Sequence, residues 1–390
     1  MRNPLSNKVM ELQPSGIRKF FDIVTEMKDA ISLGVGEPDF DTPWHVREEG
    51  IYSLEKGKTV YTSNSGLKEL REEICKYLDR RFELQYDPYK EVVVTVGGSE
   101  AIDIALRSML DDKDEVLIPQ PCFVSYLPCA KLAGGVPVII DLKEENEFRL
   151  TPEELLAAIT EKTKVLILAF PGNPTGAIMT RENLEAIAKV VIEKDIFVIS
   201  DEIYSELSYA GEHVSIASLP GMRERTVVIN GFSKSYAMTG WRLGYACGPK
   251  EIIEQMTKVH QFAIMSAPTT SQYAAIEALK NGDPDVAEMR EAYNNRRRFV
   301  VNALREMGLS CFEPLGAFYV FPCIKGFGLT SDEFATRLLQ EEKLAVVPGT
   351  AFGNCGEGFI RISYAYSIDQ LKTALERMRN FVERLKNNKE

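Results

Sequence analysis

The sequence has few of the residues on which several common catalytic and metal sites depend. Its 390 residues include only 3 histidines, and these stand far apart at His45, His213 and His260. We therefore expect neither a histidine-based metal site nor a histidine-dependent triad, and no metal is predicted. The 7 cysteines are scattered and no two are spaced as CxxC, so we expect reduced thiols that pack as small apolar side chains.

Long apolar runs and an excess of basic charge are also absent. No stretch approaches the ~18 consecutive apolar residues of a membrane span, and the first residues contain no apolar segment long enough for a signal peptide. These absences predict a cytoplasmic protein without a membrane partner. Lys plus Arg is 46 against 57 for Asp plus Glu, a net charge of -11, so no nucleic-acid partner is expected.

The residues that are present predict a large α/β domain. Hydrophobic residues make up 45% and charged residues 26% of the chain, enough for a sizeable core. Short apolar runs alternate with helical periodicity; the predicted strands are Val92–Val96, Val116–Ile118, Val136–Ile140, Lys164–Ala169, Ile196–Ser200 and Thr226–Ile229. Strands that are apolar on both faces and separated by helices predict a mostly parallel sheet sandwiched by helices.

The pattern changes after Pro268. Helical periodicity runs through roughly 269–307, and helices at 331–341 and 368–386 then alternate with strands predicted at Ala317–Phe321, Leu344–Val347 and Phe359–Ser363. Before the sheet, one helix is predicted with Ser65 as its cap, and another is predicted to begin at Ser99. We predict an N-terminal segment over 1–40 associated with the small domain, a large domain over 41–290 and a smaller C-terminal α/β domain over 291–390.

Polar residues follow several predicted strands. They are Gly97, Gly98 and Ser99 after the first strand, Asn173 in PGNPTG, Asp201 in DEIY, and Lys234 and Arg242 in NGFSKSYAMTGWRLGY. Because open α/β sheets bind ligands at the carboxyl ends of their strands, these residues are candidates for one site. Each alone has an ordinary explanation as a turn, a cap or a surface charge. Together they supply the acid, amide, lysine, arginine and phosphate-binding helix start that pyridoxal phosphate requires.

The ordered motifs also resemble a known family. FPGNPTG, SDEIYSEL, NGFSKSYAMTGWRLGY and FIRISYA are similar to those of class I aminotransferases of the aspartate and aromatic aminotransferase type, which are fold type I pyridoxal-phosphate enzymes. The resemblance covers nearly the whole chain, including LGVGEPDFDTP and YTSNSGLKELREEI. It implies an aminotransferase that uses pyridoxal 5'-phosphate.

The resemblance also implies roles for individual residues. Lys234 matches the lysine that bonds to the cofactor aldehyde and later moves a proton, and Asp201 matches the acid that pairs with the pyridine nitrogen. Asn173 and Tyr204 match donors to the ring 3′-oxygen, and Phe123 matches an aromatic ring stacked on the pyridine.

The remaining matches concern the phosphate, the substrate and a second subunit. Ser233, Arg242 and the N–H groups of Gly97, Gly98 and Ser99 match the phosphate-binding residues. Arg361 matches the arginine that binds the substrate α-carboxylate, with Gly36 in the segment that closes over it and Asn173 beside it. Tyr61 matches a tyrosine that reaches the phosphate of the neighbouring subunit, which implies a homodimer with shared active sites.

Two departures bear on the substrate. Gly231 replaces a second phosphate-binding hydroxyl of some members, and Ser99 replaces a lysine of one aspartate-preferring branch. We therefore expect an aromatic or broad L-amino acid donor, 2-oxoglutarate as acceptor and a ping-pong mechanism. Alternatives are a β-lyase or synthase on the same fold and an acyl-diaminopimelate aminotransferase. A transcription regulator is disfavoured because fewer than 40 residues precede the enzyme-like segment.

Overall fold

The largest sheet forms the centre of the molecule. The computed structural model describes residues 2–14, 27 and 29–387, and within them this sheet has seven strands in the order β2-β8-β7-β6-β5-β3-β4. Their bounds are β2 Val92–Thr95, β3 Glu115–Gln120, β4 Val136–Asp141, β5 Thr163–Ala169, β6 Phe197–Asp201, β7 Thr226–Gly231 and β8 Gly244–Cys247. The pairs among β3 to β7 are parallel, and only β8 runs antiparallel to its neighbours β2 and β7. The predicted mostly parallel sheet is confirmed.

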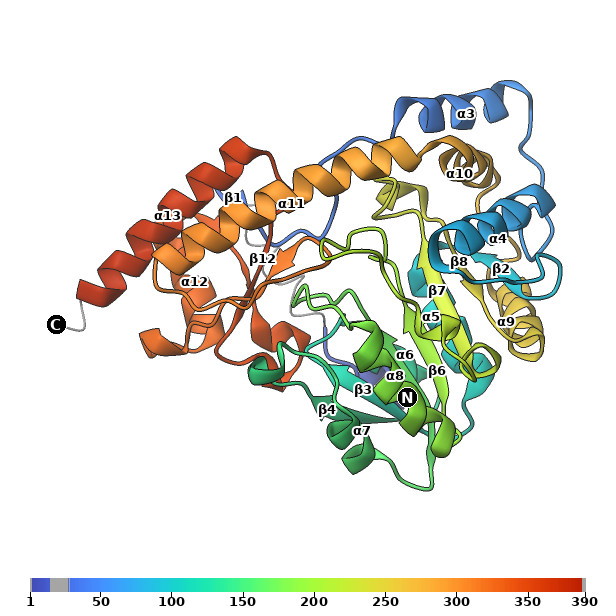
Figure 1. The fold of residues 1–390 in the computed structure, drawn as a ribbon, viewed down its shortest axis with the longest axis horizontal. Helices are drawn as coiled ribbons and strands as arrows, with labels where there is room; N and C mark the ends of the chain where they lie inside the picture. The colour runs from blue at the N-terminus through green and yellow to red at the C-terminus, as the bar shows by residue number, and fades with distance from the viewer. Residues whose placement is uncertain (1, 15–26, 28, 388–390) are drawn as a thin grey trace.

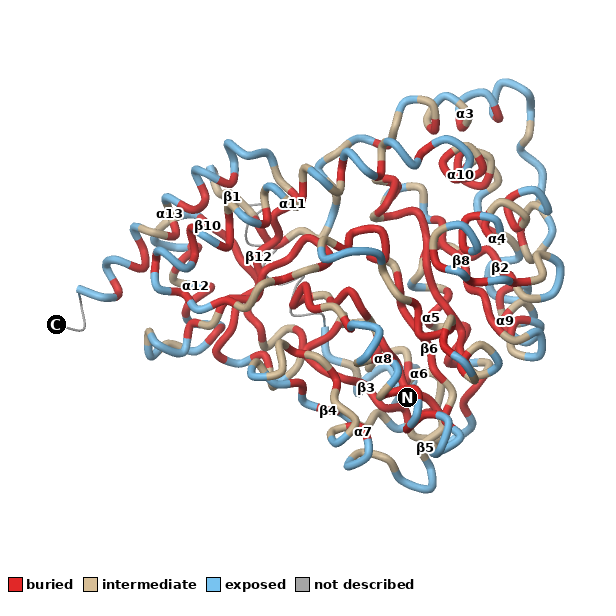
Figure 2. The backbone as a smooth tube through the Cα atoms, in the orientation of Figure 1, coloured by how far each residue is buried: buried red, intermediate tan, exposed pale blue. Residues whose placement is uncertain are grey.

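Helices cover both faces of this sheet. Successive strand residues point to opposite sides and therefore pack against different helices. Val93 packs with α5 (Gly97–Met109) and α9 (Lys250–Ala263). Val94, the next residue of β2, packs instead with α4 (Lys68–Phe82) and α10 (Thr269–Asn281). Figure 2 shows the buried residues gathered along these strands. The other helices of this part are α3 Trp44–Glu55, α6 Tyr126–Leu132, α7 Pro152–Ala158 and α8 Arg181–Glu193.

A second, smaller α/β part packs around its own core. Its helices are α11 Asp283–Glu306, α12 Ser331–Glu342 and α13 Ile368–Asn387. Its strands are β9 Tyr319–Val320, β11 Val347–Pro348 and β12 Ile360–Ser363, which form an antiparallel sheet, and β1 Ile31–Ser32 with β10 Leu344–Ala345, which pair in parallel. The strand predicted at Leu344–Val347 is therefore divided between β10 and β11. In Figure 1, α11 extends from α10 beside the large sheet to α12 and α13.

The domain limits 1–40, 41–290 and 291–390 remain a prediction. The pairing of Ile31 with Leu344 joins the N-terminal segment to the smaller part, and α11 continues across position 290. Residues 1, 15–26, 28 and 388–390 lie outside the described residues.

Two predicted helix starts are wrong. α4 begins at Lys68 with Leu67 as its N-cap, and not after Ser65. The reason is tertiary: the Ser65 carbonyl accepts a hydrogen bond from a backbone N–H of β2, and the Leu67 N–H donates to Gln272 Oε1 at 2.7 Å. α5 begins two residues before Ser99, so the predicted glycine turn is already part of the helix.

Shorter elements complete the described chain. They are α1 Asn7–Met10 and the 3-10 helices η1 Glu144–Asn146, η2 Ile216–Ser218, η3 Arg223–Arg225, η4 Thr239–Trp241, η5 Lys325–Phe327, η6 Gly349–Phe352 and η7 Asn354–Gly356. Among the described helices, none is long and apolar enough to cross a membrane.

Candidate active site

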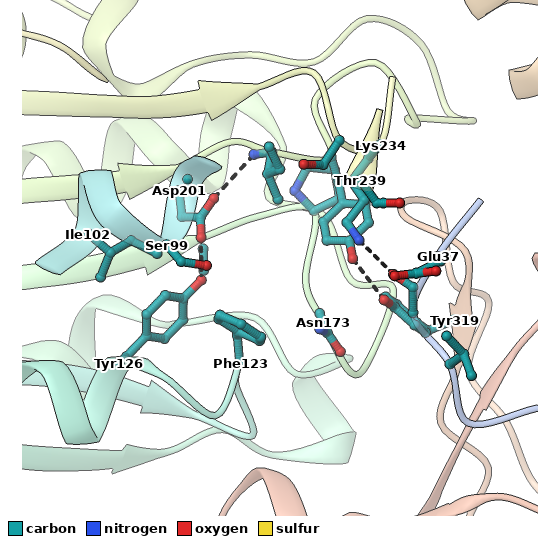
Figure 3. A pocket seen from close by; sticks show the side chains of 18 of the residues that line it. Glu37, Ser99, Ile102, Phe123, Tyr126, Asn173, Asp201, Lys234, Thr239 and Tyr319 are labelled. Carbon is teal, nitrogen blue, oxygen red and sulfur yellow. Dashed lines mark hydrogen bonds between the residues drawn. The ribbon is translucent and has the colours of Figure 1, made fainter. Parts of the chain in front are cut away.

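A cavity of about 340 Å³ is lined by both parts of the molecule. One wall comes from the residues that follow β3, β5, β6 and β7 and from the start of α5, and the other from β9, β12 and the segment after β1 (Figure 3). The fold brings together in this lining most of the residues predicted from sequence: Gly36, Gly98, Ser99, Phe123, Asn173, Asp201, Tyr204, Ser233, Lys234, Arg242 and Arg361.

One end of the cavity combines a helix start with an arginine. Gly97 opens α5 with a φ of +75°, and a Cβ built there would lie 2.7 Å from an Arg242 guanidinium nitrogen. Arg242 Nη1 donates to the Thr239 carbonyl at 2.8 Å, which orients the guanidinium. Free N–H groups of a helix start and a guanidinium both favour an anion such as phosphate. Ser233 lines the same cavity and adds a hydroxyl.

Asp201 is a buried acid at the end of β6. One carboxylate oxygen accepts a hydrogen bond from the Tyr126 hydroxyl at 2.7 Å and the other from the Ile203 N–H at 3.2 Å. Burial raises the pKa of Asp201, while these two hydrogen bonds act in the opposite direction. A protonated ring nitrogen placed beside it would favour the charged carboxylate.

Lys234 follows β7 and faces the cavity (Figure 3). Its Nζ donates to the Gly36 carbonyl at 2.6 Å. Burial lowers the pKa of Lys234 to about 8, and the charges of Arg361 and Arg242 act in the same direction. The neutral amine, which is the nucleophilic form, is therefore more populated near neutral pH than for an exposed lysine.

Arg361, in β12, is a buried cation without an acidic partner among the described residues. Its Nη1 donates to Asn173 Oδ1 at 2.8 Å, and its Nη2 donates to the Gly34 carbonyl. Its Nε is buried and has no hydrogen-bond partner in the described chain, and burial lowers the pKa of the guanidinium. A carboxylate ligand in the cavity would supply the missing charge.

Aromatic groups complete the lining. Phe123 meets Tyr126 edge to face, with ring centroids 5.7 Å apart, and the Tyr204 hydroxyl lies 2.7 Å from that of Tyr319. A Cβ at Gly36 would collide with the Tyr319 hydroxyl, so this position has no room for a side chain. Tyr126, Tyr319 and Glu37 are lining residues that the sequence analysis missed.

The structure does not bring Tyr61 to this cavity. Its side chain is 79% exposed on the surface of the chain. That Tyr61 reaches the phosphate of a neighbouring subunit stays a prediction.

The donor set fits pyridoxal phosphate. Asp201 and the Gly97/Arg242 end match the ring nitrogen and the phosphate, and Lys234 stands beside both. The apolar surfaces of Phe123 and Ile203 in the same lining suit an aromatic ring. The buried cation Arg361 is not part of this set and would suit a carboxylate ligand.

Comparison with known proteins gives the same assignment. The family described as aminotransferase class I and II matches residues 28–378. An aspartate aminotransferase of Pyrococcus abyssi is 50% identical over 96% of this chain and 97% of its own, and aromatic-amino-acid aminotransferase 2 of Thermococcus litoralis is 46% identical over the same shares. The solved structure of Pyrococcus protein-A1 superposes with a TM-score of 0.96 at 48% identity, covering 97% of this chain and 99% of that one. The chain therefore belongs to the class I and II aminotransferases, and it is a pyridoxal-phosphate-dependent transferase.

Proposed function

We propose that this aminotransferase takes the amino group of an L-amino acid, with an aromatic donor or a broad range of donors accepted, and passes it to 2-oxoglutarate in a ping-pong reaction. The proposal rests on the number of cations that line the cavity. Among the described residues that line the cavity, the cations are Lys234, Arg242 and Arg361. The carboxylates are Asp201 and Glu37. Arg361 is assigned to the α-carboxylate, Arg242 to the phosphate and Lys234 to the cofactor aldehyde, so no lining cation remains for a distal carboxylate.

The chain's own residues would perform the reaction steps as follows. Pyridoxal phosphate supplies a carbonyl carbon that takes the amino group and a ring that accepts electrons. Arg361, with Asn173 beside it, would hold the substrate α-carboxylate and orient the α-carbon toward Lys234. Lys234 Nζ would remove the α-proton and return a proton on the cofactor side. Asp201 would keep the ring nitrogen protonated.

Further contacts would hold the ring and the phosphate. Asn173 and Tyr204 would donate to the 3′-oxygen, and Phe123 would stack on the ring. The phosphate would lie against Ser233, Arg242 and the N–H groups of Gly97, Gly98 and Ser99. These placements rest on the positions of the residues in the cavity and on the fit of their donors.

The free energy of burying the donor side chain favours an aromatic donor. An aromatic side chain gains about 1.5–3 kcal/mol on burial, whereas a buried carboxylate without a cation is unfavourable. Since 2-oxoglutarate has a distal carboxylate, the acceptor step requires a cation that moves in or comes from a partner subunit.

A panel of donors tests the substrate class. Phenylalanine, tyrosine, aspartate and an acyl-diaminopimelate are each supplied with 2-oxoglutarate, and kcat/KM is measured from product formation. Phenylalanine or tyrosine should equal or exceed aspartate. An advantage of more than about tenfold for aspartate, which is 1.4 kcal/mol, would contradict the proposal. A preference for the acyl-diaminopimelate would place the enzyme in lysine biosynthesis, and ammonia plus pyruvate as products would indicate a lyase.

A homodimer with shared sites is proposed from one exposed apolar surface. Val60, Tyr61 and Phe262 are 74%, 79% and 83% exposed. The two segments that carry them are joined, because Asn64 Nδ2, after Tyr61, donates to the carbonyl of Met265, just after α9, at 2.8 Å. Large apolar side chains gathered on a surface favour a protein interface. A cytoplasmic location is proposed from the seven cysteines, all of which are free.

A further inference from the structure

Two tyrosine hydroxyls meet at the cavity, one from each part of the molecule. Tyr319 belongs to β9 of the small sheet, and Tyr204 follows β6 of the large sheet. Their oxygens are 2.7 Å apart and both side chains are buried. The rings meet edge to face, with centroids 5.8 Å apart.

The number of protons sets the direction of this hydrogen bond. A phenol has one proton to donate and can accept from others. Among the described residues, each of the two hydroxyls has the other as its hydrogen-bond partner. If Tyr204 directs its proton at the 3′-oxygen of the cofactor, the bond between the two tyrosines must use the proton of Tyr319.

The surroundings of Tyr319 favour that role. The Arg361 guanidinium lies over its ring, 4.5 Å from the centroid. Burial raises the pKa of Tyr319, and the Arg361 charge opposes this, which strengthens the phenol as a donor. Gly36 packs against the hydroxyl so closely that a Cβ there would collide with it. The hydroxyl is therefore held toward Tyr204.

We propose that Tyr319 is a positioning residue, which donates to the Tyr204 hydroxyl and so turns the Tyr204 proton toward the cofactor 3′-oxygen. The inference deepens the proposed function and rests on the role given there to Tyr204. Tyr319 of β9 would thus affect the protonation of the cofactor through Tyr204 and not through direct contact.

The proposal predicts a spectroscopic effect. A donor to the 3′-oxygen favours the deprotonated form of the bound cofactor, whose absorbance differs from that of the protonated form. Tyr319→Phe removes the supporting proton but keeps the ring under Arg361. The pH midpoint of the absorbance change should rise by about 0.3–1 unit, the size expected for loss of one neutral hydrogen bond. Tyr204→Phe should raise it further.

The experiment compares absorbance titrations of the reconstituted wild-type enzyme, Tyr319→Phe, Tyr204→Phe and the double variant. Tyr86→Phe is the matched control, because its hydroxyl is also buried but has no hydrogen-bond partner among the described residues and does not line the cavity. In the Tyr204→Phe background, Tyr319→Phe should cause no further shift. The control midpoint should equal that of the wild type.

Four other results would overturn the inference. An unchanged midpoint in Tyr319→Phe, or full additivity in the double variant, overturns the role of Tyr319 while leaving the proposed function intact. An unchanged midpoint in Tyr204→Phe overturns the proposed role of Tyr204 and this inference with it. A shift in Tyr86→Phe equal to that in Tyr319→Phe also overturns the inference, since any lost buried hydroxyl would then have the same effect.

Discussion

Burial changes the protonation behaviour of three charged side chains in the cavity. It lowers the pKa of Lys234 to about 8, raises that of Asp201 and lowers that of Arg361. Each change disfavours the charged form, which a ligand of opposite charge would stabilise. The site is thus prepared for a ligand that carries both a cationic ring nitrogen and a carboxylate.

The lowered pKa of Lys234 predicts the pH dependence of cofactor attachment. The neutral amine attacks the aldehyde, so the rate at which cofactor-free enzyme takes up pyridoxal phosphate should fall about tenfold per pH unit below 8 and level off above it. Stopped-flow absorbance between pH 6 and 10 measures this rate. A rate that continues to rise toward the ordinary lysine value of 10.5 would show that burial does not lower this pKa.

At the scale of single residues, the sequence predicted the candidate site residues that stand near strand ends. Asn173, Asp201 and Lys234 could be predicted because each stands at the end of an apolar run that forms a strand of the large sheet, or within a few residues after it. Tyr126, which donates to Asp201, stands three residues after Phe123, and the same rule could have found it. Tyr319 had no local signal, because GAFYVF has the pattern of a buried strand and only the packing of β9 brings it to Tyr204.

At the scale of elements, the start of α5 and the residues after β7 act together. Gly97 and Arg242 lie close together because both follow strands of one sheet, and Gly97 has no space for a side chain. The sequence predicted this turn but not β8, a four-residue strand that runs against its neighbours. So short a segment carries little periodicity, and its pairing is decided by β2 and β7.

The close contact at Gly97 predicts a selective loss of cofactor affinity. Gly97→Ala places a methyl 2.7 Å from Arg242 Nη2 at a φ of +75° and should weaken pyridoxal phosphate binding about 10- to 100-fold, the cost of one displaced charged hydrogen bond. Equilibrium dialysis of the cofactor measures this affinity.

Gly57→Ala is the control for backbone strain. Its φ is +67°, and a Cβ there meets no atom of the described part of the chain within 4 Å. Both variants should lose about 1–2 kcal/mol of stability in denaturant unfolding, but only Gly97→Ala should lose affinity. Equal affinity losses in the two variants would refute the steric argument.

At the scale of the whole molecule, the cavity requires both parts of the chain. Asp201 and Lys234 come from the large sheet, and Arg361 comes from β12 of the small sheet. The segment after β1 crosses between them and supplies Gly36. A relative movement of the two parts would therefore change substrate binding more than cofactor binding.

Subunit complementation tests the proposed homodimer. A Lys234→Ala chain can still lend Tyr61 to its partner, so mixing it with a Tyr61→Ala chain should create one site with both native residues. Activity of the mixture should exceed the sum of the two separate variants. The control is the same mixing without subunit exchange, which native mass spectrometry verifies. No gain after exchange would place Tyr61 outside the neighbouring site.

The most direct test of the account is to find where the cofactor is attached. The enzyme loaded with pyridoxal phosphate is reduced with borohydride, digested and analysed by mass spectrometry, beside Lys234→Ala and a control variant of the exposed Lys250. The account predicts the label on the peptide that contains Lys234, its loss in Lys234→Ala with a fall in turnover of at least about 10²- to 10⁴-fold, and no change in the control. A label on any other lysine, or a labelled and active Lys234→Ala variant, would contradict it.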